Sequence, residues 1–579
     1  MVIVGGGVAG GMVARQLSAA GIEVVVLENG GDHRQSAAAR LPSQRDELRW
    51  STHMGLMQDS ATETYTWRHN RTDLARPLRR LAVFLPGSGV GGAGNHWGGQ
   101  AFRWEEYDTE LRTRLESRYG AAAIPADMPI RDWGVSYREL EPYYDLFERL
   151  YGVAGQAGNL RGKIQPGGNP FEAPRQHAYP QPPGEETELG RLFRDAAGNR
   201  FGYKAYPSPS ALSPAAYTNP DGMKLGACQY CGHCDRFICE AEAKASPEVL
   251  LYPWLEKQPK FELRRFCHVL KVEHDPGAGQ VRGVEYLDLL TGEVCRQPAD
   301  VVVLAAFTLS NTKLLLTGGI GRPYDPGAQT GVVGRNFCYQ TNAAISVFLP
   351  DRWINPFLAS GCSVHLIEEF NDDNFDHTGL GFLGGGIIAS GSGSGRPIAA
   401  RTLPPGTPRW GTAWKQANAD GYAHAGAVGF QGSSYPQREN FLDLDPDYRD
   451  AFGQPLLRIT FDHRDNELRM AEYGAARMVE IARAMGATRL GPLEPPARPF
   501  DTRGYQSTHI TGGTSMGRDP ATSVLSPRLQ HWDAENLFVV GASAFAHNSG
   551  HNPTELVGAL ALRLGDDLVG YVRRPGRLG

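Results

Sequence analysis

A short apolar run at the N-terminus, followed at once by a glycine-rich turn, restricts the fold more than any other feature. Residues 2–4 are typical of a buried parallel strand, and the turn Gly5-Gly-Gly-Val-Ala-Gly10 follows them directly. Residues 12–17 continue with helical spacing, and residues 23–27 predict a second strand that leads into Glu28. Strand, glycine turn, helix and strand in this order predict a βαβ unit that binds a dinucleotide.

Gly5, Gly7 and Gly10 match the GxGxxG spacing, which lets the backbone approach a pyrophosphate at the N-terminus of a helix. Glu28 follows the second predicted strand and can accept hydrogen bonds from the adenosine ribose. The alternative is a tight structural turn, which the flanking strands and the acidic residue disfavour. The motif by itself leaves both NAD and FAD open as the bound dinucleotide.

A second glycine-rich stretch, residues 87–100, is too flexible for a regular element and too long for a simple turn. We expect it to lie against the bound ligand. The stretch contains Gly91, Gly92, Asn95, His96 and Trp97. Two interpretations of His96 stay open from residue type alone. Its imidazole contacts a flavin ring or is covalently linked to it, or it is bonded to the backbone of its own loop.

The composition excludes several classes of function. Lys and Arg number 58 against 63 Asp and Glu, and both signs are spread along the chain, so no basic face for nucleic acid is expected. No apolar run reaches the roughly 18 to 20 residues that span a bilayer, and no signal-peptide pattern is recognisable at the N-terminus. The sequence leaves the cytoplasm and the periplasm open as its compartment.

Four of the eight cysteines lie together at Cys228, Cys231, Cys234 and Cys239, whereas the other four are scattered. Thiolates spaced this closely on one loop converge on one point, which suits an iron–sulfur cluster or a soft metal ion. The bacterial ferredoxin run has three residues before its last cysteine and this chain has four, so [3Fe-4S] and [4Fe-4S] clusters are both open. A structural zinc ion and free or disulfide-bonded thiols are the alternatives.

Several segments together resemble the glucose-methanol-choline (GMC) family of flavoprotein oxidoreductases. They are residues 5–17, residues 89–99, residues 299–316 and the C-terminal pair 507–517 and 550–554. Within the family, the cysteine run and the ending Gly-His-Asn-Pro-Thr resemble the large flavoprotein subunits of bacterial gluconate and fructose dehydrogenases and the related glycoside 3-dehydrogenases. Pyranose 2-oxidase is a more distant match, through its His-Trp and Asn-Pro-Thr elements.

The resemblance implies an FAD cofactor and points to residues that would bind it. Val269 lies where the family's backbone contacts the adenine. Gly541 and Ala542 match the segment that returns the chain to the flavin. Pro553 and Thr554 open the closing helix, whose positive N-terminal end would point at the flavin ring.

Two further positions follow from the resemblance. The third flavin-binding strand ends in Ala305-Ala306-Phe307, where the family often has Ala-Ala-Gly, so we expect the backbone there to approach the cofactor differently. His96, followed by Trp97, matches the histidine that carries the covalent bond to the flavin in pyranose oxidases and some sugar dehydrogenases. The resemblance therefore keeps a covalent link open.

His509 and Asn552 match the family's catalytic histidine and its His/Asn partner. An alcohol must lose its hydroxyl proton as its carbinol hydride leaves, and an imidazole can take that proton while an amide holds the oxygen. The alternative for Asn552 is a helix cap, because Asn followed by Pro553 is a common helix start. His547 and His551 are expected to be polar neighbours of the catalytic pair.

The expected fold is α/β (α+β), a Rossmann-like FAD-binding domain with a discontinuous substrate domain built on an antiparallel sheet. Residues 1–110, 221–345 and 500–579 are assigned to the FAD-binding domain, and residues 111–220 and 346–499 to the substrate-binding domain. Residues 137–150 within the latter predict an amphipathic helix.

The function expected from the resemblance is oxidation of a secondary hydroxyl of a sugar, glycoside or polyol to a ketone by an FAD-dependent dehydrogenase. Electrons would pass through the cluster, for which the resemblance favours [3Fe-4S], to an external acceptor such as a cytochrome or a quinone-linked protein. The chain has no CxxCH haem motif, so a cytochrome would be a separate subunit, and a small partner subunit is also expected. The alternatives are an oxidase that reduces O2 and keeps a structural cysteine site, and a flavoprotein electron-transfer subunit.

Overall fold

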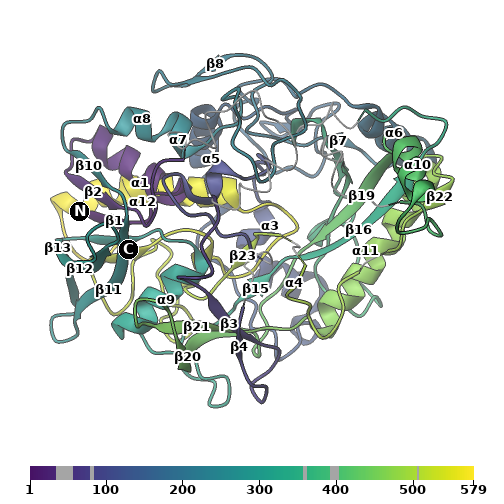
Figure 1. The fold of residues 1–579 in the computed structure, drawn as a ribbon. Coiled ribbons are helices and arrows are strands. Elements are labelled where there is room, and N and C mark those ends of the chain that lie inside the picture. The colour runs from purple at the N-terminus through teal and green to yellow at the C-terminus, as the bar shows by residue number, and fades with distance from the viewer. Residues whose placement is uncertain (34–55, 79–83, 356–360, 392–402, 494, 505–506) are drawn as a thin grey trace.

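A parallel sheet of five strands forms one side of the molecule (Figure 1). The computed structural model describes residues 1–33, 56–78, 84–355, 361–391, 403–493, 495–504 and 507–579. The strands of the sheet follow the order β10 (Phe261–Arg264), β2 (Val24–Leu27), β1 (Val2–Val4), β14 (Val302–Leu304) and β24 (Leu537–Val539). Every neighbouring pair is parallel. β1 therefore lies in the middle of the sheet, with both of its edges paired.

The predicted βαβ unit at the N-terminus is confirmed. β1 leads through the glycine turn into α1 (Val8–Ala19), and the chain returns to the sheet as β2. All residues of β1 and β2 are buried, because helices and loops cover both faces of the sheet. Strands buried on both faces consist of uninterrupted apolar residues, which is the pattern that the sequence shows here.

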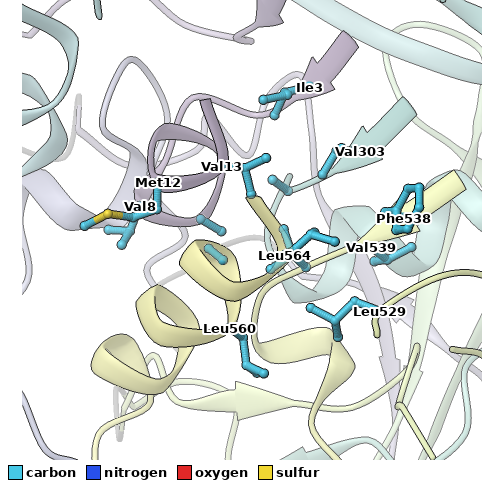
Figure 2. Packing of buried hydrophobic residues seen from close by; sticks show 14 of the residues in the cluster. Ile3, Val8, Met12, Val13, Val303, Leu529, Phe538, Val539, Leu560 and Leu564 are labelled. Atoms are coloured by element: carbon cyan, nitrogen blue, oxygen red, sulfur yellow. The ribbon is translucent and has the colours of Figure 1, made fainter. Parts of the chain in front are cut away.

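The C-terminal helix α12 (Thr554–Arg573) packs against both α1 and α5 (Tyr137–Tyr151). Two glycines allow this close approach. A Cβ on Gly565 would lie 2.5 Å from a side-chain carbon of α1, and a Cβ on Gly558 would lie 2.2 Å from the ring of Phe147 on α5. Figure 2 shows the apolar side chains of α1, α12 and the parallel sheet gathered in one core.

An antiparallel sheet of six strands lies across the molecule from the parallel sheet (Figure 1). Its order is β22 (Arg489–Leu490), β16 (Thr341–Phe348), β19 (Ala425–Gly432), β18 (Gly386–Gly391), β17 (His365–Ile367) and β7 (Tyr206–Pro207). Helix α11 (Asp465–Ala484) packs on one face of β16 and β19, around a second apolar core. The predicted fold class, a Rossmann-like unit with an antiparallel sheet, is confirmed.

A four-stranded sheet connects the two predicted domains. Its order is β20 (Phe441–Arg449), β21 (Pro455–Thr460), β3 (Tyr65–Arg68) and β4 (Arg76–Pro77). β3, assigned to the FAD-binding domain, pairs in parallel with β21, assigned to the substrate domain. The predicted boundary at residue 345 falls inside β16. The division into domains stays a prediction. Its boundary at residue 345 divides β16, and the pairing of β3 with β21 joins the two predicted domains in one sheet.

The remaining elements connect these sheets. The helix predicted over residues 137–150 is confirmed as α5, which begins with a capping box between Ser136 and Glu139.

The other strands are β11 (Cys267–Asp275), β12 (Gln280–Asp288), β13 (Val294–Pro298), β15 (Cys338–Tyr339), β23 (Ile510–Thr511), β5 (Asn159–Leu160), β6 (Lys163–Ile164), β8 (Tyr217–Thr218) and β9 (Lys224–Leu225). The other helices are α3 (Glu106–Thr109), α4 (Leu111–Tyr119), α6 (Glu188–Ala196), α7 (Pro247–Leu250), α8 (Tyr252–Leu255), α9 (Thr308–Gly318) and α10 (Thr412–Gly421). Within the described residues, no helix is both long and apolar enough to cross a bilayer.

Candidate functional site

A cavity of about 830 Å³ is lined by residues from both the parallel sheet and the six-stranded sheet. This volume lies within the roughly 300 to 1,000 Å³ typical of ligand sites. The predicted residues that line it are Gly5, Gly7, Glu28, Gly92, His96, Trp97, Cys234, Val269, Ala305, His509, Gly541, Ala542, Asn552, Pro553 and Thr554. The predicted residues outside its wall are Gly10, Gly91, Asn95, Cys228, Cys231 and Cys239. Segments far apart in the chain therefore meet in one space.

The β1–α1 turn presents the N-terminus of α1 to this cavity. Gly5 has φ +103°, and a Cβ there would lie 2.6 Å from the carbonyl oxygen of Ala305. Gly7 precedes the helix, and no heavy atom lies within 4 Å of the place where its Cβ would be. Gly10 packs inward against the Gly5 carbonyl. The first N–H groups of α1 and the open space beside Gly7 fit a pyrophosphate, which a Cβ at Gly7 would obstruct.

Glu28 lies at the end of β2, where the sequence predicts a contact with the ribose. Its carboxylate accepts hydrogen bonds from the backbone N–H groups of Gly6 at 2.7 Å, Gly30 at 2.9 Å and Gly89 at 3.2 Å. Burial raises the pKa of Glu28 to about 7, although these N–H groups act in the opposite direction. The carboxylate is therefore held in one orientation and joins the β1–α1 turn to the second glycine-rich stretch.

His96 is buried beside the cavity, and its Nε2 has no hydrogen-bond partner among the described residues. Burial, and next the positive charge of Lys244, lower the pKa of His96 to about 3, so its imidazole is neutral. An uncharged ring at the wall of this cavity, with an Nε2 that has no partner among the described residues, fits either a contact or a bond to a flavin. The neighbouring Asn95 is directed elsewhere, because its Nδ2 donates to the Val90 carbonyl at 2.6 Å.

The segment after β14 carries the residue that departs from the family pattern. Phe307 adopts φ 75° and ψ 160°, a region that is ordinarily restricted to glycine, and it lines the cavity. A side chain held there stores about 1 to 3 kcal/mol of strain. The departure from Ala-Ala-Gly is therefore accommodated by a strained phenylalanine in a glycine-like conformation.

His509 precedes β23 and lines the cavity. Its Nδ1 lies 2.5 Å from Oε1 of Gln340, and its Nε2 has no hydrogen-bond partner in the described part of the chain. Burial lowers the pKa of His509 to about 4, because the surrounding protein disfavours the imidazolium. At neutral pH the ring is thus uncharged and can accept a proton.

Asn552 lies just before α12 and also lines the cavity. Its Oδ1 accepts a hydrogen bond from Nε2 of Gln431 at 2.9 Å, which leaves its Nδ2 to donate to a ligand. The cap residue of α12 is Pro553, so the alternative reading of Asn552 as the helix cap is wrong. Asn552 directly precedes this cap residue, and Nε1 of Trp104 donates a hydrogen bond to the backbone carbonyl oxygen of Asn552 at 3.2 Å.

The two neighbouring histidines are fully buried behind the cavity wall. Nε2 of His551 lies 2.9 Å from the carboxylate of Glu368, and the ring stacks on Phe102 at 5.1 Å. His547 lies 3.3 Å from the carboxylate of Asp108 and accepts from Nε1 of Trp133 at 3.1 Å. Both histidines support the loop that carries Asn552, and neither lines the cavity.

The buried pair of His551 and Glu368 should contribute most to stability in mildly acidic solution. Burial lowers the pKa of His551, but the charge and hydrogen bond of Glu368, together with the charges of Asp108 and Asp372, outweigh this effect and raise it above 6.5. Burial raises the pKa of Glu368, but the charge and hydrogen bond of His551, together with the hydrogen bonds from Tyr206 and Asn371, outweigh this effect and lower it below 4.5. The contribution of His551 is complete below pH 6.5 and is lost as pH rises through its folded pKa. The contribution of Glu368 is complete above pH 4.5 and is lost as pH falls through its folded pKa.

We expect His551→Phe or Glu368→Gln alone to lower the free energy of unfolding by about 3 to 5 kcal/mol, because one buried group loses its partner. Urea unfolding of both single variants and the double variant gives the coupling free energy between the two side chains. This coupling should be larger at about pH 5.5 than at about pH 9. Equal coupling at both pH values would contradict an ionised pair.

The cysteine loop lies against the loop that carries His96 and Trp97. The Arg236 N–H donates to the His96 carbonyl at 2.6 Å. The buried ammonium of Lys244 donates to the carbonyl oxygens of Trp97 at 2.8 Å, Cys234 at 2.7 Å and Phe237 at 2.6 Å. Among the described residues, no three His, Cys, Asp or Glu side chains are gathered to hold a metal ion. The predicted cluster thus stays a prediction, on a loop that lies beside the cavity.

Known proteins are similar to this chain along its whole length. The sequence profile of the GMC oxidoreductase family matches residues 436–561. The gluconate 2-dehydrogenase flavoprotein of Pantoea cypripedii is 42% identical, and the alignment covers 100% of this chain and 94% of that protein. The fructose dehydrogenase large subunit of Gluconobacter japonicus is 26% identical, with 99% and 98% covered. A variant of Aspergillus oryzae formate oxidase shares the fold with a TM-score of 0.60 at 15% identity, over 99% of this chain and 98% of that one.

Proposed function

This chain belongs to the GMC oxidoreductase family, and from that premise we propose that it oxidises a secondary hydroxyl of a sugar, glycoside or polyol to a ketone. It is an FAD-dependent oxidoreductase that acts on CH–OH groups. The observation that carries the proposal is the cavity in which the phosphate-binding turn, His509 and Asn552 meet. The names of two relatives, a gluconate and a fructose dehydrogenase, support a substrate of the sugar type.

Two side chains can perform the proton chemistry of this reaction. Bound FAD supplies the acceptor for the hydride that leaves the carbinol carbon. Nε2 of His509 is the base that takes the hydroxyl proton, since the low pKa of the ring keeps its lone pair available at neutral pH. Nδ2 of Asn552 donates to the substrate oxygen, where negative charge develops as the proton leaves.

A panel of alcohols tests the substrate class. Gluconate, fructose, methyl glucosides, inositols and simple alcohols are each mixed with the enzyme and an artificial electron acceptor. We expect turnover with at least one sugar or polyol and a ketone as the product. Turnover with simple primary alcohols alone, or an aldehyde product, would contradict the proposed substrate class.

We also propose that FAD is bound covalently through His96. The supporting observation is the buried, uncharged imidazole at the cavity, whose Nε2 has no partner among the described residues. Acid precipitation of the purified protein tests the bond, because covalent flavin stays with the pellet. The pellet of the parent protein should be yellow, and that of His96→Ala should be colourless. Yellow colour in the supernatant of the parent protein would contradict the link.

The cysteine loop bears on where the electrons go. We propose that Cys228, Cys231, Cys234 and Cys239 hold an iron–sulfur cluster, which passes electrons to an external acceptor protein. The spacing of the four cysteines in the sequence fits a [3Fe-4S] or a [4Fe-4S] cluster. The arrangement of the four thiols in this structure does not by itself form a metal site within the described residues. The proposal therefore rests on the spacing and on the position of the loop beside the cavity.

Iron and acid-labile sulfide analysis separates a dehydrogenase from an oxidase. A dehydrogenase of the proposed kind contains stoichiometric iron and sulfide and reacts slowly with O2. An iron-free protein with fast O2 turnover would instead be an oxidase with a structural cysteine site. Co-purification of a small subunit or a cytochrome would support the expected partners, as the name of the fructose dehydrogenase large subunit suggests for that relative.

A further inference from the structure

A fully buried glutamine connects His509 to the loop that carries Asn552. Gln340 lies between β15 and β16 and is 0% exposed. Its backbone N–H donates to the His509 carbonyl at 3.2 Å, within the pairing of β15 and β23. Its side chain therefore starts from a fixed position beside the imidazole. Gln340 does not line the cavity, so it can act on the reaction only through other residues.

The orientation of the Gln340 amide follows from what surrounds it. Nε2 donates to the carbonyl oxygen of Ser549 at 2.9 Å and to that of His551 at 3.2 Å. Carbonyl oxygens only accept hydrogen bonds, so both must face the NH2 group of the amide. Oε1 is then the atom that lies 2.5 Å from Nδ1 of His509. A flipped amide would place an oxygen against two carbonyl oxygens.

An oxygen at this position decides where the imidazole carries its proton. The amide oxygen has only lone pairs, so the hydrogen bond to it requires a proton on Nδ1. In a neutral imidazole the other nitrogen, Nε2, then holds the lone pair. We propose that Gln340 is a positioning residue that fixes His509 in the tautomer with Nδ1 protonated, so that Nε2 always meets the substrate as a base. This inference rests on the proposed role of His509.

A neutral amide can orient the His509 imidazole without raising its pKa, whereas a carboxylate in the same place would raise it. His551 shows the alternative within the same molecule, because its carboxylate partner Glu368 raises its pKa. His509 has no such partner, and burial, the cause that lowers its pKa, acts without an opposing charge. Its other polar neighbours are uncharged: Asn548 donates to its carbonyl oxygen at 2.7 Å, and Ser507 accepts from its N–H at 3.3 Å. Gln340 thus orients the ring without making it a cation.

Two variants separate orientation from charge. Gln340→Met removes the hydrogen bond, so the ring can adopt either tautomer, and kcat should fall by about 10- to 100-fold with little change in KM. Gln340→Glu replaces the amide by a carboxylate, which should raise the pKa of His509. The acid limb of kcat/KM, near pH 4 in the parent enzyme, should then move to higher pH.

A direct readout does not depend on turnover. In protein labelled with nitrogen-15 histidine, the chemical shifts of the two ring nitrogens identify the tautomer, and the signal of His509 is assigned by its loss in His509→Ala. The parent protein should show Nδ1 protonated, and Gln340→Met should show a mixture. A parent signal with the proton on Nε2 would overturn the inference.

Gln530 supplies a matched control. It is 1% exposed, and its Nε2 also donates to two backbone carbonyls, of Glu535 at 2.6 Å and of Gly576 at 3.0 Å, away from the cavity. Gln530→Met should therefore lose similar hydrogen bonds without changing the pH profile or the His509 signal. If Gln340→Met behaves like Gln530→Met while His509→Ala is inactive, the inference fails and the proposed function stands. If His509→Ala keeps its activity, the proposed role of His509 fails, and the inference that rests on it fails with it.

Discussion

Replacing His509 by alanine should lower kcat by about 10² to 10⁴-fold and leave FAD bound. A positioned general base contributes a rate factor of this size, and His509 is the base proposed for this cavity. The neutral ring, held through Nδ1 by Gln340, is the group that we propose takes the alcohol proton. Anaerobic reduction of the bound flavin by an alcohol of the panel, followed by its absorbance, measures the effect.

The control for this variant is His463→Ala. His463 is buried, its pKa is also lowered to about 4 by burial, and it lies outside the cavity. Its replacement should leave the rate of flavin reduction per bound FAD unchanged.

Added imidazole should restore part of the activity of His509→Ala, since a free base can enter the space left by the side chain. A His509→Ala enzyme that oxidises alcohols at the parent rate would contradict the assignment of His509 as the base.

Replacing Gly7 by glutamate should abolish FAD binding without unfolding the protein. Gly7 has φ −82°, which other residues adopt, and no heavy atom surrounds the position of its Cβ. The new carboxylate would lie in the space that fits the pyrophosphate, at the N-terminus of α1. Two like charges at such short range cost several kcal/mol, which corresponds to a loss of affinity of at least about 10³-fold. Flavin absorbance per protein after gel filtration measures the effect.

The matched control is Gly570→Glu on α12. This position also has no heavy atom within 4 Å of its Cβ, and it lies away from the cavity. The same change of charge there should leave FAD binding intact. Circular dichroism and thermal unfolding should show both variants folded. A Gly7→Glu protein that retains its full FAD content would contradict the placement of the pyrophosphate at this turn.

The N-terminal half of the site could be predicted because its chemistry is local in sequence. The strand, glycine turn and acidic residue from Val2 to Glu28 all serve one βαβ unit, and the structure forms that unit as expected. The helix at α5 was equally predictable, since its apolar spacing and its Ser136 cap lie within one segment. Patterns within about 30 residues carry this information.

The other half could not be predicted because it depends on contacts between distant segments. Gln340 lies 169 residues from His509, and an isolated glutamine carries no motif. Gln431 meets Asn552 from 121 residues away, and Lys244 reaches the Trp97 carbonyl across 147 residues. The pairing of β3 with β21, which cuts across the predicted domain boundary, is of the same kind. Only the tertiary fold brings these groups together.

The role of Asn552 shows how a local rule can mislead. Asn before Pro is a common helix start, and α12 does begin here, but the cap is Pro553. The Asn552 side chain instead meets Gln431 from the six-stranded sheet, and this contact leaves its NH2 group for the cavity. The structure places the cap at Pro553, and the catalytic role of Asn552 stays a prediction.

Flavin reduction by a carbinol-deuterated substrate tests the central claim most directly. The enzyme is mixed without oxygen with the panel alcohol that turns over, in its ordinary form and with deuterium on the oxidised carbon. We predict that the flavin absorbance is bleached, more slowly with the deuterated alcohol, and that His509→Ala with bound FAD is bleached far more slowly with either. An FAD-loaded parent enzyme that no alcohol of the panel bleaches, or a His509→Ala enzyme bleached at the parent rate, would contradict the claim that His509 serves alcohol oxidation in this cavity.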